Sequence, residues 1–183
     1  MPTEASLKQF YGKVNDFKDQ ILRLLRRLSG KKLVDREGHP LDIEEEIASL
    51  NKGYDKLMMA KAINELEPIK AMYENGIMPM IEPILLRDEV FFLDGLDGRV
   101  PGAYEEILQD LPSNITDFLF LHQVRIIWSH LDLIEDKAVK AILWAHIQIF
   151  CLLAEKVLSQ IDPYYYNIFA TTKQQLIDSG RLS

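Results

Sequence analysis

Two nonapeptides in the second half of the chain each place a Trp two residues before a His. They are IIWSHLDLI at 126–134 and ILWAHIQIF at 142–150, with apolar residues at matching places. Imidazoles in pairs can bind a metal ion, titrate near neutral pH or share hydrogen bonds. On one straight helix the sixteen-residue separation turns the second pair by about 160°, so the pairs face opposite ways. On two antiparallel helices that meet near Asp136, both pairs can face one core.

We interpret this repeat as one packing arrangement used on two neighbouring helices. His130 and His146 lack the i, i+4 spacing of a helical zinc site, and neither belongs to an HExxH motif. A hydrogen-bonding or pH-sensitive histidine pair and a metal site are the alternatives. We therefore predict neither a metal site nor a cofactor.

A set of histidines and carboxylates between residues 122 and 136 could still carry out hydrolysis. Its members are His122, His130, Asp132 and Glu135, with His146 further along the chain. A solvated junction between two helices explains Asp132, Glu135 and Asp136 more simply. A Gly-rich phosphate loop, a Cys–His nucleophile pair and a nucleophile elbow are absent from the sequence. The sequence thus predicts a protein that is not an enzyme, with a small all-α metal-dependent hydrolase as the alternative.

The loop LDGLDGRVPG at 93–102 is a further candidate site. Asp94 and Asp97 could bind a divalent cation and Arg99 could bind an anion. The sixth position counted from Asp94 is Arg99, where an EF-hand requires Gly. Since Asp-Gly pairs are common in turns for reasons of backbone conformation, we interpret the loop as a structural turn.

The N-terminal third of the chain contains two apolar seams with helical spacing. Gly30 ends the first seam, Asp42 is a predicted N-cap of the second, and Gly38 and Pro40 mark a chain reversal between them. The first seam consists of Leu7, Phe10, Val14, Phe17, Ile21, Leu24 and Leu28, and the second of Ile43, Ile47, Leu50, Tyr54 and Leu57. We predict an antiparallel helical hairpin over residues 1–67, with a basic and an acidic arm whose opposite charges favour pairing.

The turn LVDREGHPLDIEEE at 33–46 resembles the turn between the two coiled-coil helices of the proteasome assembly chaperone that carries a C-terminal PDZ domain. The spacing departs from that pattern after Pro40, and nothing downstream resembles a PDZ domain. A helical hairpin needs Gly, Pro and an Asp cap at its turn, which accounts for the shared residues.

The remaining residues, 68–183, are predicted to form an irregular connector and a helical bundle. Pro and Gly make the segment around 77–112 irregular. A long helical region over 113–161 is expected to break near Asp136, and a last helix covers 163–178. The predicted fold class is all-α, with both parts forming one compact unit.

Composition and charge exclude several functional classes. The 183 residues are 48% hydrophobic and 27% charged, with a net charge of -7, which is typical of a globular protein. Residues 1–36 carry nine basic and four acidic residues (+5), and the remaining 147 carry twelve and twenty-four (-12). The acidic bulk argues against a nucleic-acid partner, because phosphate neutralisation dominates such binding.

We expect an intracellular, cytoplasmic protein without a membrane span. Cys151 is the only cysteine, and the N-terminus MPTEASLKQF lacks an apolar signal core. The most apolar window, 141–154, is shorter than the ~20 residues that a span requires, so we interpret it as a buried helix.

The expected partners are proteins, with a second copy of the chain as one candidate through the hairpin seam. One predicted contact surface combines the seam with the basic arm of the hairpin: Phe10, Phe17, Arg23, Arg26 and Arg27. The other consists of the consecutive tyrosines Tyr164, Tyr165 and Tyr166, of which a helix must expose at least one.

Overall fold

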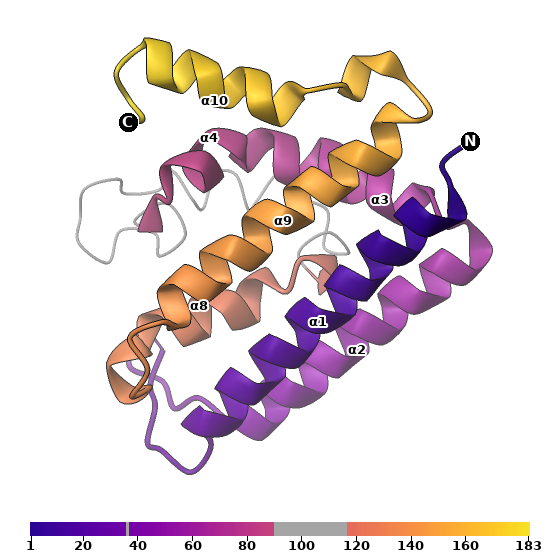
Figure 1. Cartoon of the computed structure of the whole chain (residues 1–183). Coiled ribbons are helices and arrows are strands. Elements are labelled where there is room, and N and C mark those ends of the chain that lie inside the picture. Colours follow the sequence, from indigo (N-terminus) through magenta and orange to yellow (C-terminus); the bar gives the residue numbers. More distant parts are fainter. Residues whose placement is uncertain (36, 90–116) are drawn as a thin grey trace.

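The computed structural model describes residues 1–35, 37–89 and 117–183, which form a bundle of packed helices (Figure 1). Within these ranges the only extended pairing is an isolated bridge between Val34 and Pro40. The predicted all-α fold is confirmed. The helices α1 (Glu4–Leu28) and α2 (Ile43–Ile63) lie side by side, and α9 (Val139–Ser159) runs beside α1 across the bundle (Figure 1).

Local capping interactions define the N-terminal hairpin. Thr3 begins α1 by accepting a hydrogen bond from the Ser6 backbone N–H through its hydroxyl. The predicted cap at Asp42 is confirmed: one carboxylate oxygen accepts from the backbone N–H groups of Glu44 and Glu45 at 3.0 and 3.3 Å. Between the helices Gly38 adopts φ +86°, a left-handed conformation that favours glycine.

Contacts of lysine and tyrosine side chains join the two arms of the hairpin. Lys18 Nζ lies 4.4 Å from the ring centre of Tyr54, and Lys61 Nζ lies 4.5 Å from that of Tyr11. The Tyr11 hydroxyl also donates to the carbonyl oxygen of Glu65 at 2.6 Å. Across the described parts of both arms no close ion pair joins α1 to α2, so the attraction between a basic and an acidic arm stays a prediction. The lysines cover apolar rings with their stems and place their charge over the ring face.

The segment that follows is more regular than predicted. α2 ends at Ile63, and α3 (Glu67–Met72), the π-helical turn η1 (Tyr73–Ile77) and α4 (Met78–Leu86) follow. The prediction of irregular structure is therefore wrong over 77–86. The part of the predicted irregular segment from 90 to 112 lies outside the described residues.

Two prolines in α4 explain why the sequence suggested irregular structure there. Pro79 stands in the first turn of α4, where the missing N–H is not needed, and Pro83 lies inside the helix. Met80, Ile84 and Leu85 are all buried. Burial of one apolar face thus stabilises a helix that local preference opposes.

The long helical region is two helices, as the polarity near Asp136 indicated. α8 (Leu121–Ser129) and the short 3-10 helix η2 (Leu131–Leu133) precede α9. The ring centres of Trp128 on α8 and Trp144 on α9 are 4.9 Å apart, with the planes tilted by 53°. The two Trp residues of the repeat therefore pack against each other, as the packing interpretation predicted.

The C-terminal segment forms two helical pieces instead of the single helix predicted over 163–178. They are the 3-10 helix η3 (Pro163–Tyr165) and α10 (Ile168–Asp178). Asp162 caps η3, accepting from the backbone N–H of Tyr164 at 2.9 Å. Asn167 separates the pieces because its φ of 57° is left-handed, a conformation that Asn tolerates better than most residues.

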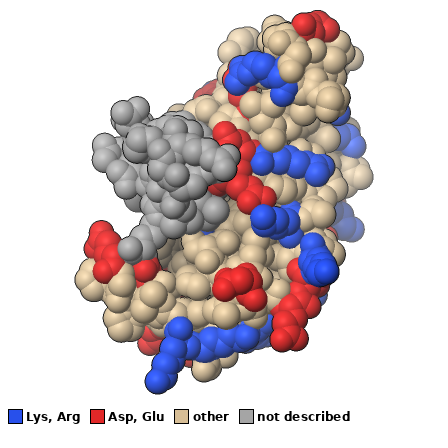
Figure 2. All heavy atoms as spheres, turned by 90° about the vertical axis from the view of Figure 1, so that its left-hand side faces the viewer, with Lys and Arg blue, Asp and Glu red and all other residues tan. Residues whose placement is uncertain are grey.

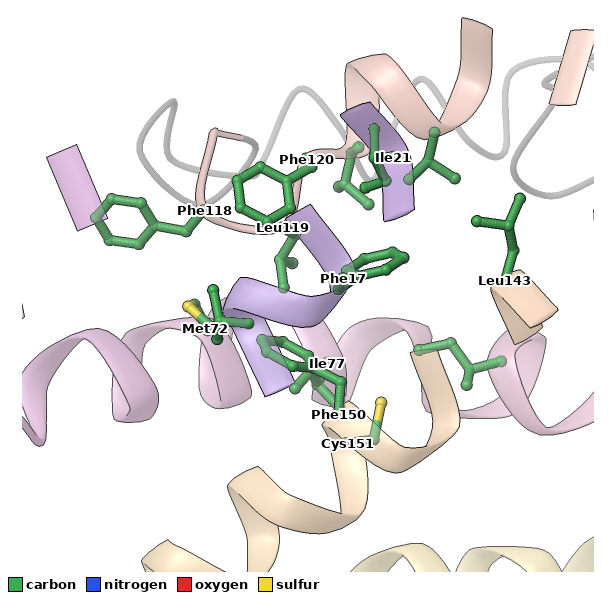
Figure 3. Close-up of a cluster of buried hydrophobic side chains, with 14 of the residues drawn as sticks. Phe17, Ile21, Met72, Ile77, Phe118, Leu119, Phe120, Leu143, Phe150 and Cys151 are labelled. Atoms are coloured by element: carbon green, nitrogen blue, oxygen red, sulfur yellow. The ribbon is translucent and has the colours of Figure 1, made fainter. Parts of the chain in front are cut away.

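One hydrophobic cluster includes residues from both predicted parts of the chain, 1–67 and 68–183. Phe17 of α1, Phe120 before α8 and Phe150 of α9 point into it from three different segments (Figure 3). Gly53 lets α2 approach residue 117 closely, since a Cβ there would lie 3.1 Å from the Asp117 carbonyl oxygen. The hairpin is packed on the bundle and does not project from it.

Trp144→Ala tests the packing of the repeat. Trp144 is 3% exposed, so its removal should lower the free energy of unfolding by about 3–5 kcal/mol in urea denaturation. Tyr166→Ala is the control. Because the Tyr166 side chain is 69% exposed, its removal should change the free energy of unfolding by less than about 0.5 kcal/mol. Equal midpoints for Trp144→Ala and the wild type would contradict this packing.

Candidate interaction surface on helix α9

The outward side of α9 carries an apolar stripe, defined here as Ala138, Ala141, Ala145, Ile149 and Leu152. Ile149 is 43% exposed and Leu152 46% exposed, and the three alanines are exposed as well. Intervals of three and four residues place all five side chains on one side of the helix. In the described part of the chain no element covers this stripe.

The opposite side of α9 faces the core, so the helix is apolar nearly all round. Leu143, Phe150 and Ala154 are almost fully buried. By length and composition α9 could cross a membrane, and 44% of its most apolar window is buried in this structure. Central helices of soluble bundles have the same properties. The prediction that 141–154 is a buried helix therefore holds for one side of α9 only.

The two ends of the stripe carry different sets of charged side chains. Lys156 lies at its C-terminal end, where its ammonium group donates to the Gln9 side chain at 2.8 Å. Beside its N-terminal end, Asp132, Glu135 and Asp136 line a hollow of about 480 Å³, together with Lys137, Lys140 and apolar neighbours. Acidic and basic side chains are interspersed on the side of the molecule shown in Figure 2.

His146 lies between this stripe and α1. Its ring stacks on Phe17, with 5.6 Å between ring centres, and its Nδ1 is buried without a hydrogen-bond partner among the described residues. Burial and then the charge of Lys13 lower the pKa of His146; Asp16 raises it and Arg23 lowers it by smaller amounts. His146 is therefore a packing residue held neutral by its surroundings.

His130 does not meet His146, so the repeat forms no histidine pair. The Nδ1 of His130 lies 2.8 Å from the Ile126 carbonyl oxygen, and its Nε2 lies 3.2 Å from that of Val34. The ring of His130 therefore lies between the end of α8 and the hairpin turn, and in its neutral form it donates to only one of the two carbonyl oxygens.

The residues of the alternative hydrolase site are divided between two hollows. His122 and His130 line one of about 490 Å³, which Asp35 and Glu37 of the hairpin turn also line. Asp132 and Glu135 line the other hollow, at the start of α9. Glu46 of α2 contacts the Nε2 atom of His122 at 3.3 Å. Among the described residues no group of three or more His, Cys, Asp or Glu is arranged to hold a metal ion.

Two predicted contact residues are in the interior of the chain. Phe10 is fully buried and packs on Phe150 with 5.0 Å between ring centres; Phe17 is 4% exposed. Neither side chain is accessible to a protein partner here. Since α9 covers the hairpin seam, the seam itself gives no physical reason for dimerisation.

The basic part of the predicted surface remains at the exterior. Arg23, Arg26 and Arg27 are all exposed. Arg23 donates to the Gln20 side chain at 2.7 Å, and Arg27 lies 3.7 Å from an Asp136 carboxylate oxygen. Of these three residues, Arg27 reaches the junction that precedes α9.

The three tyrosines have different environments. Tyr164 and Tyr166 are 65% and 69% exposed, whereas Tyr165 is 7% exposed. The Tyr165 hydroxyl donates a hydrogen bond to the Glu74 carboxylate. That hydrogen bond, followed by burial, raises the pKa of Tyr165 to about 12. Tyr165 therefore anchors η3 to η1, and only its two neighbours can meet a partner.

A buried carboxylate that sequence reasoning missed connects α9 to the C-terminal helix. Glu155 is 7% exposed, and its Oε2 accepts from the Tyr73 hydroxyl at 2.9 Å and from the Phe169 backbone N–H at 2.8 Å. Asn167 provides no side-chain cap for α10, so Glu155 satisfies an N–H of its first turn from another helix. Its position in the apolar run CLLAEKVL, facing inward, was the available signal.

Asp94, Asp97 and Arg99 lie outside the described residues. No family model, curated protein or solved structure matches this chain.

His146→Gln should alter how stability depends on pH. The lowered pKa of His146 keeps it neutral in the folded protein, while an unfolded histidine takes up a proton near pH ~6.5. Acidification below that value therefore favours unfolding. The loss of stability continues as the pH falls from the pKa of the unfolded histidine to the lower pKa of His146 in the folded protein. The free energy of unfolding, measured by urea denaturation, should fall less between pH 7 and pH 5 in the variant than in the wild type. Parallel losses in both proteins would contradict this assignment.

Proposed function

We propose that this chain is a non-catalytic protein–protein interaction or assembly protein whose docking surface is the apolar stripe of α9. The observation that supports this most is the exposure of Ile149 and Leu152 on a helix whose other side forms the core. Contiguous exposed apolar side chains are typical of interaction sites, and helical intervals suit a partner helix.

The surroundings of the stripe support the same function. Charged side chains lie at both ends of it, as in the polar rim of a protein interface. Tyr164 and Tyr166, with Ile161 46% exposed, provide a second aromatic and apolar area beyond the end of α9. The net charge of -7 favours a protein over a nucleic acid as the partner.

The alternative, a metal-dependent hydrolase, has less support. Its carboxylates Asp132 and Glu135 line a different hollow from His122 and His130, and His146 lines neither. Both nitrogens of His130 face backbone carbonyl oxygens. A hydrolytic site needs its acid, base and water within hydrogen-bond reach of one another.

The double variant Ile149→Glu, Leu152→Glu should lose binding partners and keep the fold. Both positions are exposed, so the melting temperature should change little, while two charges are placed in the docking surface. Affinity enrichment from the source cells with the immobilised protein is the measurement.

Ile177→Glu is the matched control, because Ile177 is 39% exposed and lies on α10. Proteins retained by the wild type and by this control should be missing from the double variant. If all three proteins retain the same partners, α9 is not the docking surface.

A further inference from the structure

We propose that the partner of the α9 stripe is the α9 stripe of a second copy of the chain, packed antiparallel about a two-fold axis at Ala145. This inference rests on the proposed function and specifies its partner. It follows from the order of side-chain sizes along the stripe and from the charges at its two ends.

The stripe changes from small to large along the helix. Ala138, Ala141 and Ala145 occupy its N-terminal part, and Ile149 and Leu152 its C-terminal part. In an antiparallel pair centred on Ala145, each Ile149 meets Ala141 of the second copy and each Leu152 meets Ala138. Every large side chain then packs on a small one, which makes the surface self-complementary, as a two-fold interface requires.

A parallel pair would place like side chains opposite each other. Ile149 would face Ile149 and Ala141 would face Ala141, so that the helices are forced apart at one end and leave voids at the other. Intervals of three and four residues also suit helices that cross at about 20°, at which the contact extends along the whole stripe. The antiparallel arrangement therefore fits the observed side chains better.

The charges favour the same arrangement. Lys156 lies about 16 Å beyond Ala145 along the helix axis, and Val139 lies about 9 Å before Ala145, at 1.5 Å per residue. Lys156 of the second copy therefore reaches past the start of α9, where three carboxylates, Asp132, Glu135 and Asp136, and two lysines, Lys137 and Lys140, line the hollow.

Basic side chains in that hollow are partly engaged within the chain. Of its two lysines, Lys137 and Lys140, Lys140 pairs with Glu89 at 2.9 Å, and Arg27 of α1, outside the hollow, approaches Asp136 at 3.7 Å. Glu135 is exposed and adjoins Ile134, the position that mirrors Lys156 about Ala145. Two symmetry-related Lys156–Glu135 pairs would fix the register of the dimer.

Single cysteines along the stripe test the arrangement in the full chain. Under mild oxidation, Ala145→Cys should form a disulfide-linked dimer at least about tenfold faster than Ala141→Cys or Ile149→Cys, because only position 145 meets itself within disulfide range. Mixing the last two variants should give the cross-linked heterodimer. The wild type is the control, since Cys151 is buried and burial raises its pKa to about 12, which leaves the thiol unreactive.

Equal cross-linking at all three positions would indicate a parallel pair and would overturn the proposal. The absence of cross-linking at every position would overturn it as well. In that case, the loss of partners by the Ile149→Glu, Leu152→Glu variant would still support the proposed function. The stripe would then bind a different protein and not a second copy. If that variant keeps every partner, the proposed function fails independently.

A charge exchange tests the register in solution. Glu135→Lys and Lys156→Glu should each raise the dimer Kd about tenfold in sedimentation equilibrium, because each places like charges opposite one another, and the double variant should restore it to within about threefold. The predicted pair would be contradicted if the single variants left the dimer Kd unchanged. It would also be contradicted if the double variant dimerised no more tightly than either single variant.

Discussion

The packing of two aromatic side chains of α1 on α9 determines how the rest of the bundle is arranged. The rings of Phe10 and Phe150 lie 5.0 Å apart, and Phe17 stacks on His146 at 5.6 Å. A helix that is apolar nearly all round has several sides it could bury. α1 contacts the side of α9 that carries His146 and Phe150. This contact fixes the rotation of α9 about its own axis, so Ile149 and Leu152 face outward.

The other neighbours of α9 hold it in the same orientation. Trp144 packs on Trp128 of α8, and Glu155 links Tyr73 of η1 to the first turn of α10. A buried carboxylate without hydrogen bonds would be unfavourable, so Glu155 favours the one arrangement in which its partners converge. Among the described elements, α1, α3, η1, α4, η3 and α10 all contact α9, and Trp128 of α8 packs on it.

Much of the local structure follows from short-range sequence signals. The seam from Leu7 to Leu28 and the cap at Asp42 are patterns that neighbouring residues complete by themselves. The separation of α8 from α9 followed from a polar junction. Pro79 and Pro83 indicated irregular structure because local preference opposes a helix there, whereas burial of Met80, Ile84 and Leu85 outweighs that preference.

The candidate surface could not be read from the sequence in the same way. Spacing alone determined that residues 139–159 form an apolar helix and that Phe10 and Phe17 belong to a seam, because helical periodicity is a local property. Only the tertiary structure decided that α9 covers the seam, that Tyr165 is buried between exposed neighbours, and that Glu155 caps a helix beginning thirteen residues later. Similar apolar faces can pair in several ways, and the contacts that select one of them join residues far apart in the chain.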